Sequence, residues 1–290
     1  MIYAEQMDLA RLDERYQRYL RVLGVDHVPA GLEGLRALVR LHLYRVPFEN
    51  LSKLLLFGRE KAGRFLTLDE FLDGLERQDF GGTCHSNNPF LGELLRALGY
   101  DARLLGADMG PRLNVHTCLR VHLEGVAYHV DVGYGGPFRE PVRLDRLPLE
   151  IVEGAERYAF SSRTDAPGYE MVAYAGDERV HGYSVNEQER TREFFTPPML
   201  ISFQPDAAFL NCVRICRFFD SYSVTLLDRQ LKIHRDGRTT VTELKSAAEW
   251  ADALKEAVRM PRAPWRQALA VMEQVTGRPF FESQAASADS

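Results

Sequence analysis

The hydrophobic pattern of this chain changes near residue 100, and the change restricts the folds that the chain can adopt. Before residue 100, apolar residues recur three and four positions apart, as they do on one face of an amphipathic helix. This spacing predicts four helices, at residues 9–23, 32–43, 67–75 and 84–98. After residue 100, apolar and polar residues alternate, which is typical of half-buried strands. The change therefore predicts an α+β protein whose first part is helical.

Further short strands and two more helices are predicted in the rest of the chain. The strands are expected at residues 158–161, 171–174, 223–227 and 232–244, and the helices at 246–258 and 265–275. The order of elements is therefore helical, then mostly β, then mixed.

The strongest strand pattern is a hairpin formed by residues 115–123 and 126–132, joined by a two-residue Glu124-Gly125 turn. In that register His116 lies diagonally from Asp131 on the same face of the pair, within reach of a long side chain. Arg120 lies on the other diagonal. The hairpin therefore predicts that Asp131 pairs either with a histidine or with an arginine.

A glycine-rich polar stretch, residues 80–88, leads into the fourth predicted helix and places Cys84 at its start. The free N–H groups and the positive dipole end of a helix N-terminus favour a thiolate there. Cys84, His116 and Asp131 would then supply a nucleophile, a base and an orienting carboxylate. The alternatives are a structural cysteine, which is commoner at such a position, and a buried histidine without a catalytic role.

A zinc site is the other chemistry that these residue types suggest. Six cysteine and histidine residues occur within one segment of the chain: Cys84, His85, His116, Cys118, His122 and His129. They lack the short Cys-x₂₋₄-Cys and His-x₃₋₅-His spacings of structural zinc sites. No metal is therefore expected.

Charge and composition limit the classes of partner. The net charge is −5 with no basic block, so nucleic acid is not the expected partner. No apolar run approaches the ~18 residues of a membrane span, so no membrane partner is expected either. Four irregularly spaced cysteines do not suit a disulfide framework, which favours a reducing, cytoplasmic setting.

Three motifs carry a resemblance to a known family. They are Arg45-Val46-Pro47-Phe48-Glu49-Asn50-Leu51, Gly81-Gly82-Thr83-Cys84 and Val130–Pro137, together with the 15-residue spacing of His116 and Asp131. In this combination the chain resembles the arylamine N-acetyltransferase family over about residues 5–140.

The resemblance implies three domains around a cysteine-protease-like core. Residues 1–100 would form an N-terminal helical bundle that carries Cys84. Residues 101–205 would form a central antiparallel β-barrel that carries His116 and Asp131. Residues 206–290 would form a C-terminal α/β lid with the last helices.

The resemblance also implies an activity. Acetyl-CoA would donate an acetyl or short acyl group to Cys84, and the resulting thioester would acylate an arylamine, a hydrazine or a related amine in a ping-pong reaction. Acetyl-CoA would be a co-substrate, no cofactor would be bound permanently, and the protein would be a monomer or homodimer. An amide synthase or thioester hydrolase with the same triad is the alternative enzyme. An inactive binding homologue is the alternative outside enzymes.

The expected binding residues follow from the same motifs. Gly133, Tyr134, Gly135 and Gly136 are expected at the cofactor, and Phe48, Phe80, Thr83 and His85 at the amine substrate.

The chain departs from the family pattern around Cys84. The family usually has arginine at Phe80, aromatic residues at Thr83 and His85, and glutamate at Ser86. These departures predict a reshaped acceptor site that prefers a bulkier or more apolar amine to simple anilines. His85 itself is expected to be exposed without a role, and the alternative is that it helps to set the protonation of the adjacent Cys84 thiol. The alternative to a helix that starts at Cys84 is a helix kinked or restarted at Pro89, with Asn88 as its cap.

Overall fold

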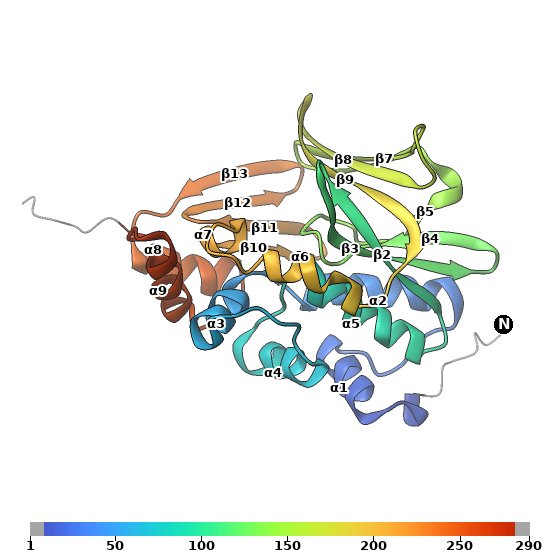
Figure 1. The fold of residues 1–290 in the computed structure, drawn as a ribbon, viewed down its shortest axis with the longest axis horizontal. Coiled ribbons are helices and arrows are strands. Elements are labelled where there is room, and N and C mark those ends of the chain that lie inside the picture. Colours follow the sequence, from blue (N-terminus) through green and yellow to red (C-terminus); the bar gives the residue numbers. More distant parts are fainter. Residues whose placement is uncertain (1–8, 282–290) are drawn as a thin grey trace, which may run out of the picture.

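The computed structural model describes residues 9–281, in which helices from the first part of the chain lie against two antiparallel sheets (Figure 1). The predicted α+β class is confirmed. The α-helices are α1 (Glu14–Leu23), α2 (Gly31–Arg45), α3 (Leu51–Glu60), α4 (Leu68–Gln78), α5 (Cys84–Ala97), α6 (Thr196–Ile201), α7 (Ala208–Asn211), α8 (Ala247–Asp252) and α9 (Trp265–Thr276). A π-helical segment, Ala253–Ala257, continues α8, and short 3₁₀ helices occur at Leu9–Arg11, Leu144–Arg146 and Glu193–Phe195.

The eight-stranded sheet has the order β5-β4-β3-β2-β9-β8-β7-β6 and curls into a half-barrel. Its strands are β2 (Asp101–Met109), β3 (Arg112–Leu123), β4 (Val126–Val130), β5 (Val142–Arg143), β6 (Leu149–Glu153), β7 (Glu156–Ser162), β8 (Tyr169–Ala175) and β9 (Glu178–Glu189). The inner face of the sheet buries its own apolar cluster, which includes Leu105, Phe160 and Met171.

The five-stranded sheet has the order β1-β10-β11-β12-β13. Its strands are β1 (Phe48–Glu49), β10 (Arg214–Phe218), β11 (Tyr222–Leu227), β12 (Gln230–Arg235) and β13 (Arg238–Glu243). Phe48 pairs with Cys216, so a strand of the first part completes the sheet of the last part. The side chain of Asn50 strengthens this junction by binding the backbone of Phe209, Cys212 and Arg214.

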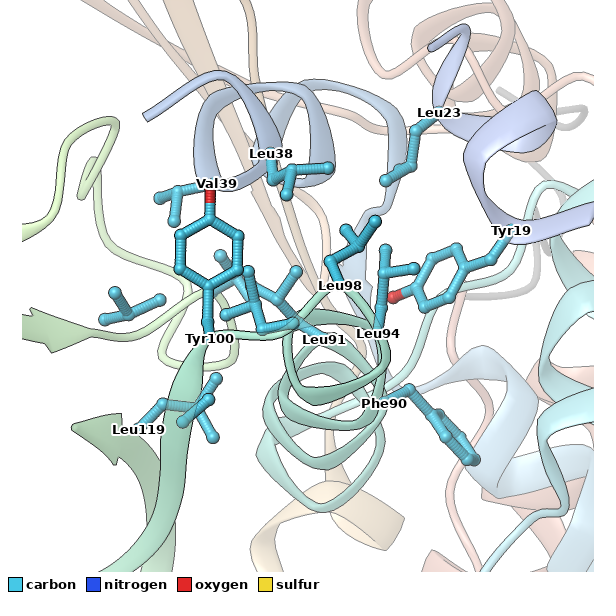
Figure 2. Close-up of a cluster of buried hydrophobic side chains, with 14 of the residues drawn as sticks. Tyr19, Leu23, Leu38, Val39, Phe90, Leu91, Leu94, Leu98, Tyr100 and Leu119 are labelled. Carbon is cyan, nitrogen blue, oxygen red and sulfur yellow. The ribbon is translucent and has the colours of Figure 1, made fainter. Parts of the chain in front are cut away.

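Helix α5 is held by apolar contacts on several sides (Figure 2). Its predicted stripe is buried, and Leu91, Leu94 and Leu98 meet side chains from α1, α2 and β3. Removing one such leucine side chain costs about 2–5 kcal/mol of stability. This packing fixes the direction of α5 and hence the position of Cys84 at its first residue.

The alternative of a helix that restarts at Pro89 is wrong. Helix α5 runs unbroken through Pro89, because its neighbours Phe90 and Leu91 are buried and their packing outweighs one missing backbone hydrogen bond. Asn88 is not a cap, since its side chain binds the strands that lie against α5. Helix α3 and strand β1 were not predicted from the sequence pattern.

The predicted division of the chain at residues 100 and 205 remains a prediction. Leu51 and Leu54 of α3 share a core cluster with Leu210, Trp250 and Leu269 from the last part of the chain. In residues 9–281, each helix is too short or too polar to cross a membrane.

Candidate active site

Three elements bring Cys84, His116 and Asp131 together. Cys84 is the first residue of α5, His116 lies on β3, and Asp131 directly follows β4. The Nε2 atom of His116 lies 2.7 Å from a carboxylate oxygen of Asp131, and both side chains are almost fully buried. The hydroxyl of Thr117 donates to the carbonyl oxygen of Cys84 at 2.7 Å, which fixes the start of α5 against β3.

The predicted hairpin register is confirmed, with Leu119 opposite Val130 across β3 and β4. This register places His116 and Asp131 on the same face. The alternative partner, Arg120, instead lies 3.6 Å from the carboxylate of Glu187 and donates to the carbonyl oxygen of the same residue. Asp131 therefore pairs with the histidine.

Asn88 orients the carboxylate of Asp131. Its side-chain amide donates to Asp131 Oδ1 at 2.8 Å and to the carbonyl oxygen of Thr117 at 2.5 Å. Its amide oxygen accepts the N–H of Val132, and the N–H of Gly133 donates to the same Asp131 oxygen. The second oxygen of Asp131 is left for His116. The sequence analysis assigned no such role to Asn88. The available signal was an asparagine whose spacing from the leucines places it on the buried, apolar face of the helix.

The charges of His116 and Asp131 stabilise one another. Burial alone would lower the pKa of His116, but the charge and hydrogen bond of Asp131, with further contributions from Cys84, raise it to about 10. Burial alone would raise the pKa of Asp131, but His116 and Asn88 lower it below its usual value. An imidazolium and a carboxylate therefore lie beside Cys84 at neutral pH. A cation next to a cysteine favours its thiolate.

The Pro-Phe-Glu-Asn-Leu motif shapes the loop that precedes Cys84. Glu49 is fully buried, and its carboxylate accepts hydrogen bonds from Ser52 and from the N–H of Gly81. Burial raises the pKa of Glu49. A Cβ atom at Gly81 would lie 2.0 Å from the carbonyl oxygen of Pro47, so only glycine fits there. The motif thus holds the Gly81-Gly82 loop, which leads into α5.

The Gly133–Gly136 loop passes directly over the start of α5. A Cβ atom at Gly133 would lie 2.7 Å from Cys84 Cα. Tyr134 hydrogen-bonds to His181, and its ring packs edge-on against His116 with centroids 5.6 Å apart. Gly135 lies against Phe48 and, with Pro137, borders a cavity of about 230 Å³ between the two sheets.

The four predicted substrate residues lie in three places. Phe48 packs beside Gly135. Thr83 and His85 line a small pocket next to the start of α5. Phe80 instead packs in the core with Leu51 and Leu54. The structure therefore groups Thr83 and His85 but sets Phe80 apart from them.

The expectation that His85 is exposed is wrong. Only 8% of His85 is accessible, because its ring lies between Phe65 and Phe195, at centroid distances of 6.1 Å. Burial, with smaller contributions from nearby cations, lowers the pKa of His85 to about 3. In the described part of the chain, no three Cys, His, Asp or Glu residues form a group that could hold a metal.

Comparisons with known proteins agree with this arrangement. A model of the N-acetyltransferase family matches residues 31–261. Arylamine N-acetyltransferase of Mycolicibacterium smegmatis is 30% identical over 249 residues, 81% of this chain and 88% of that protein. The N-malonyltransferase FDB2 of Gibberella moniliformis is 35% identical over 153 residues, 46% of this chain and 41% of that protein. The solved structure of Mycobacterium marinum arylamine N-acetyltransferase in complex with CoA has a TM-score of 0.75 and 25% identity, covering 90% of this chain and 99% of that chain.

The α+β fold and these matches define an acyltransferase. The chain belongs to the arylamine N-acetyltransferase family, as its sequence motifs predicted.

Proposed function

We propose that this protein transfers an acetyl or other short acyl group from an acyl-CoA to the nitrogen of an amine, through a thioester on Cys84. The observation that carries the proposal is the buried His116–Asp131 pair, 2.7 Å apart, beside the cysteine that begins α5. Family membership supports the acyl-CoA donor and an arylamine, hydrazine or related acceptor. The proposed setting is the cytoplasm, and the proposed state is a monomer or homodimer.

In the first step, the Cys84 thiolate attacks the thioester carbonyl of the acyl-CoA. A bond forms between Cys84 Sγ and the acyl carbon, and the bond from that carbon to the CoA sulfur breaks. The departing CoA thiolate takes the proton of the His116 imidazolium. Asp131 holds the ring in place, since Nε2 is bound to its carboxylate and Nδ1 is left for the sulfur.

In the second step, the amine nitrogen attacks the same carbonyl carbon. The nitrogen–carbon bond forms, the Cys84 sulfur–carbon bond breaks, and the surplus amine proton passes to His116. The backbone N–H of Cys84 is the proposed donor to the oxyanion, because the first N–H groups of a helix have no acceptor within the helix. Only 9% of Cys84 is accessible, which helps to keep water from the thioester.

The cavity of about 230 Å³ between the sheets is the proposed approach for CoA. Gly135, predicted at the cofactor, lines it together with Arg214, whose guanidinium suits a phosphate group. Lys232 lies on the same wall but is already paired with Glu156 at 2.6 Å. Gly133, Tyr134 and Gly136 remain predicted cofactor residues through the same loop.

The test is incubation of the protein with acetyl-CoA without amine, followed by intact mass and peptide mapping. We expect one acetyl group, on Cys84, which is released when an aromatic amine or hydrazine is added. No adduct with any short acyl-CoA would instead favour a binding homologue, and rapid loss of the adduct to water would favour a thioester hydrolase. Amine panels with thiol release measured would separate small anilines from bulkier acceptors.

A further inference from the structure

Arg139 follows the Gly133–Gly136 loop and bonds to both sheets. Its two Nη atoms donate to the two carboxylate oxygens of Glu153 on β6, each at 2.9 Å. Its Nε atom donates at 3.3 Å to the carbonyl oxygen of Phe219, in the turn between β10 and β11. One side chain therefore joins the loop to an edge strand of the eight-stranded sheet and to the five-stranded sheet.

The Arg139–Glu153 pair is largely shielded from solvent. The exposed fractions of the two side chains are 20% and 16%, which makes it the least exposed ion pair that a lysine or an arginine forms in residues 9–281. The guanidinium carbon also lies 5.8 Å from the ring centroid of Phe218. A two-pronged contact between arginine and carboxylate fixes geometry as well as adding energy, and shielding from water strengthens it. The pair therefore holds its two elements in one relative position.

The Gly133–Gly136 loop depends on anchors outside itself, because three of its four residues are glycines. Glycine has no side chain that packs, and it leaves the backbone the most freedom. Asp131 holds the start of the loop by accepting the N–H of Gly133. After the loop, Phe138 is buried in the core of the eight-stranded sheet, and Arg139 adds the bonds to β6 and to the five-stranded sheet.

The loop and Glu153 border the same cavity. Gly135, Pro137 and Glu153 all line the space of about 230 Å³ between the sheets. At its start the loop passes over α5, where a Cβ atom at Gly133 would lie 2.7 Å from Cys84 Cα. The position of the loop therefore sets both a wall of the cavity and the space above the reacting residue.

We propose that Arg139 is a positioning residue for the acyl-CoA donor. Its pair with Glu153 holds the Gly133–Gly136 loop where the cavity admits CoA toward Cys84. The inference rests on the proposed function and on the proposed approach of CoA, and it adds a residue to that approach. The bonds that form and break at Cys84 are unchanged, since Arg139 acts only through the loop.

Direct binding of a CoA phosphate by Arg139 is the alternative role. The structure favours positioning, because the Nε atom and both Nη atoms already donate to protein acceptors. Pro137 and Glu153 line the cavity, whereas Arg139 is not among the described residues that do so. The two roles predict opposite effects for Glu153. Loss of its charge would weaken CoA binding if it holds the loop, and would strengthen CoA binding if it only neutralises a phosphate ligand.

The experiment measures single-turnover acylation of Cys84 at increasing acetyl-CoA concentration, with intact mass as the readout. In Arg139→Met we expect the half-saturating concentration of acetyl-CoA to rise about 10-fold, the scale of one lost charged hydrogen bond. The maximal rate should change by less than about 3-fold, because saturating CoA restores the bound position of the loop.

Glu153→Gln tests the sign of the effect and covers the case in which Arg139→Met does not fold. It keeps the shape of the side chain and removes the charge, so the half-saturating concentration should rise by about 3- to 10-fold. The double variant should be no worse than Arg139→Met alone, since both residues act through one contact. A lower half-saturating concentration in Glu153→Gln would overturn the inference in favour of direct phosphate binding.

Two controls separate positioning from a general loss of structure. Alkylation of Cys84 by iodoacetamide needs no CoA, so its rate should stay within about 2-fold in both single variants. The matched control is Arg157→Met, which removes an arginine of β7 that is paired with Glu150 of β6 and exposed. That variant should keep the half-saturating concentration of the unmodified protein. If Arg139→Met slows alkylation as much as acylation, the role of Arg139 is structural and the inference is wrong.

The same data separate this inference from the proposed function. An unchanged half-saturating concentration in Arg139→Met and in Glu153→Gln, with the acetyl adduct still on Cys84, would overturn the inference and leave the proposed function standing. If the unmodified protein forms no adduct with acetyl-CoA, the proposed function fails, and this inference fails with it.

Discussion

His116 and His85 are both buried beside Cys84, yet their environments favour opposite charge states. His116 faces Asp131, which raises its pKa to about 10 against the effect of burial. His85 lies between aromatic rings, and burial lowers its pKa to about 3. Burial disfavours the charged form of histidine, and one well-placed carboxylate reverses the outcome. The two sides of Cys84 therefore differ in charge, since the side of His116 carries an ion pair and the side of His85 is neutral.

A third histidine on the hairpin extends the comparison. His129 lies on β4, two residues before Asp131, and is as buried as His116. Its ring nitrogens bind the hydroxyls of Tyr169 and Tyr183 at 2.8 and 2.9 Å. Burial lowers its pKa to about 4, because neutral hydroxyls do not offset the loss of solvation. The charge of His116 therefore results from the carboxylate of Asp131 and not from the position of His116 on the sheet.

The largest expected effect comes from removing the carboxylate partner of His116, so that His116, like His129, has only neutral partners. Asp131→Asn keeps the shape but supplies an amide, which favours the wrong imidazole tautomer. Acylation of Cys84 by acetyl-CoA should fall by about 10³- to 10⁴-fold. Stopped-flow release of CoA thiol measures the rate, and circular dichroism checks the fold.

Arg120→Ala is the control for this variant, because Arg120 is the alternative partner that the register allows. It contacts Glu187 instead of Asp131, so the acylation rate should change by less than about 3-fold. A larger loss in Arg120→Ala than in Asp131→Asn would show that the histidine–carboxylate pair is structural.

The reactivity of the Cys84 sulfur tests whether the charged His116–Asp131 pair acts on it. The charged His116–Asp131 pair lies beside Cys84, so alkylation of Cys84 by iodoacetamide should be fast at neutral pH. Burial raises the pKa of Cys118, and it raises that of Cys212 to about 11, so both should react slowly at neutral pH. Peptide mapping should show Cys84 reacting about 100-fold faster than either. Acetyl-CoA should protect Cys84, and equal labelling of the three residues would contradict the charged pair.

A smaller effect is expected from removing a hydrogen bond that orients the carboxylate of Asp131 while keeping the carboxylate itself. Asn88→Ala deletes the amide that holds Asp131 Oδ1, so acylation should slow by about 10- to 100-fold. Asn87→Ala is the matched control, since Asn87 is equally buried but binds the carbonyl oxygens of Pro47 and Gly82. Both variants should lower the midpoint of thermal unfolding. If both slow acylation equally, the effect of Asn88 is one of stability and not of orientation.

The sequence predicted the contact between His116 and Asp131 well. The hairpin register depends on a two-residue turn and on alternating residues, both of which are local, and it suffices to bring His116 to Asp131. The helix that starts at Cys84 was likewise visible in the spacing of Leu91, Leu94 and Leu98. Local patterns of this kind are kept in the folded protein because their apolar residues are buried in the core.

The surroundings of His85, the other side of the comparison, could not be predicted from the sequence. His85 is covered by Phe65 and Phe195, which come from distant segments, and β1 pairs with β10 across most of the chain. The same limitation affects Phe80, which was expected at the substrate but packs in the core formed by α3 and the last helices. Long-range packing decides these positions, and periodicity carries no information about it.

The smallest expected effect tests the uncharged side of Cys84 through stability alone. His85 has a buried ring nitrogen with no partner in the described structure, which is unfavourable. His85→Phe fills the same space between Phe65 and Phe195 with an apolar ring, so the free energy of unfolding should stay the same or rise by up to about 1 kcal/mol. The corresponding change at the paired histidine, His116→Phe, leaves the buried carboxylate of Asp131 without its partner. It should lower the free energy of unfolding by about 3–5 kcal/mol. Urea unfolding of both variants measures the difference, and a His85→Phe protein that is several kcal/mol less stable would mean that the nitrogen of His85 is bound in the native state after all.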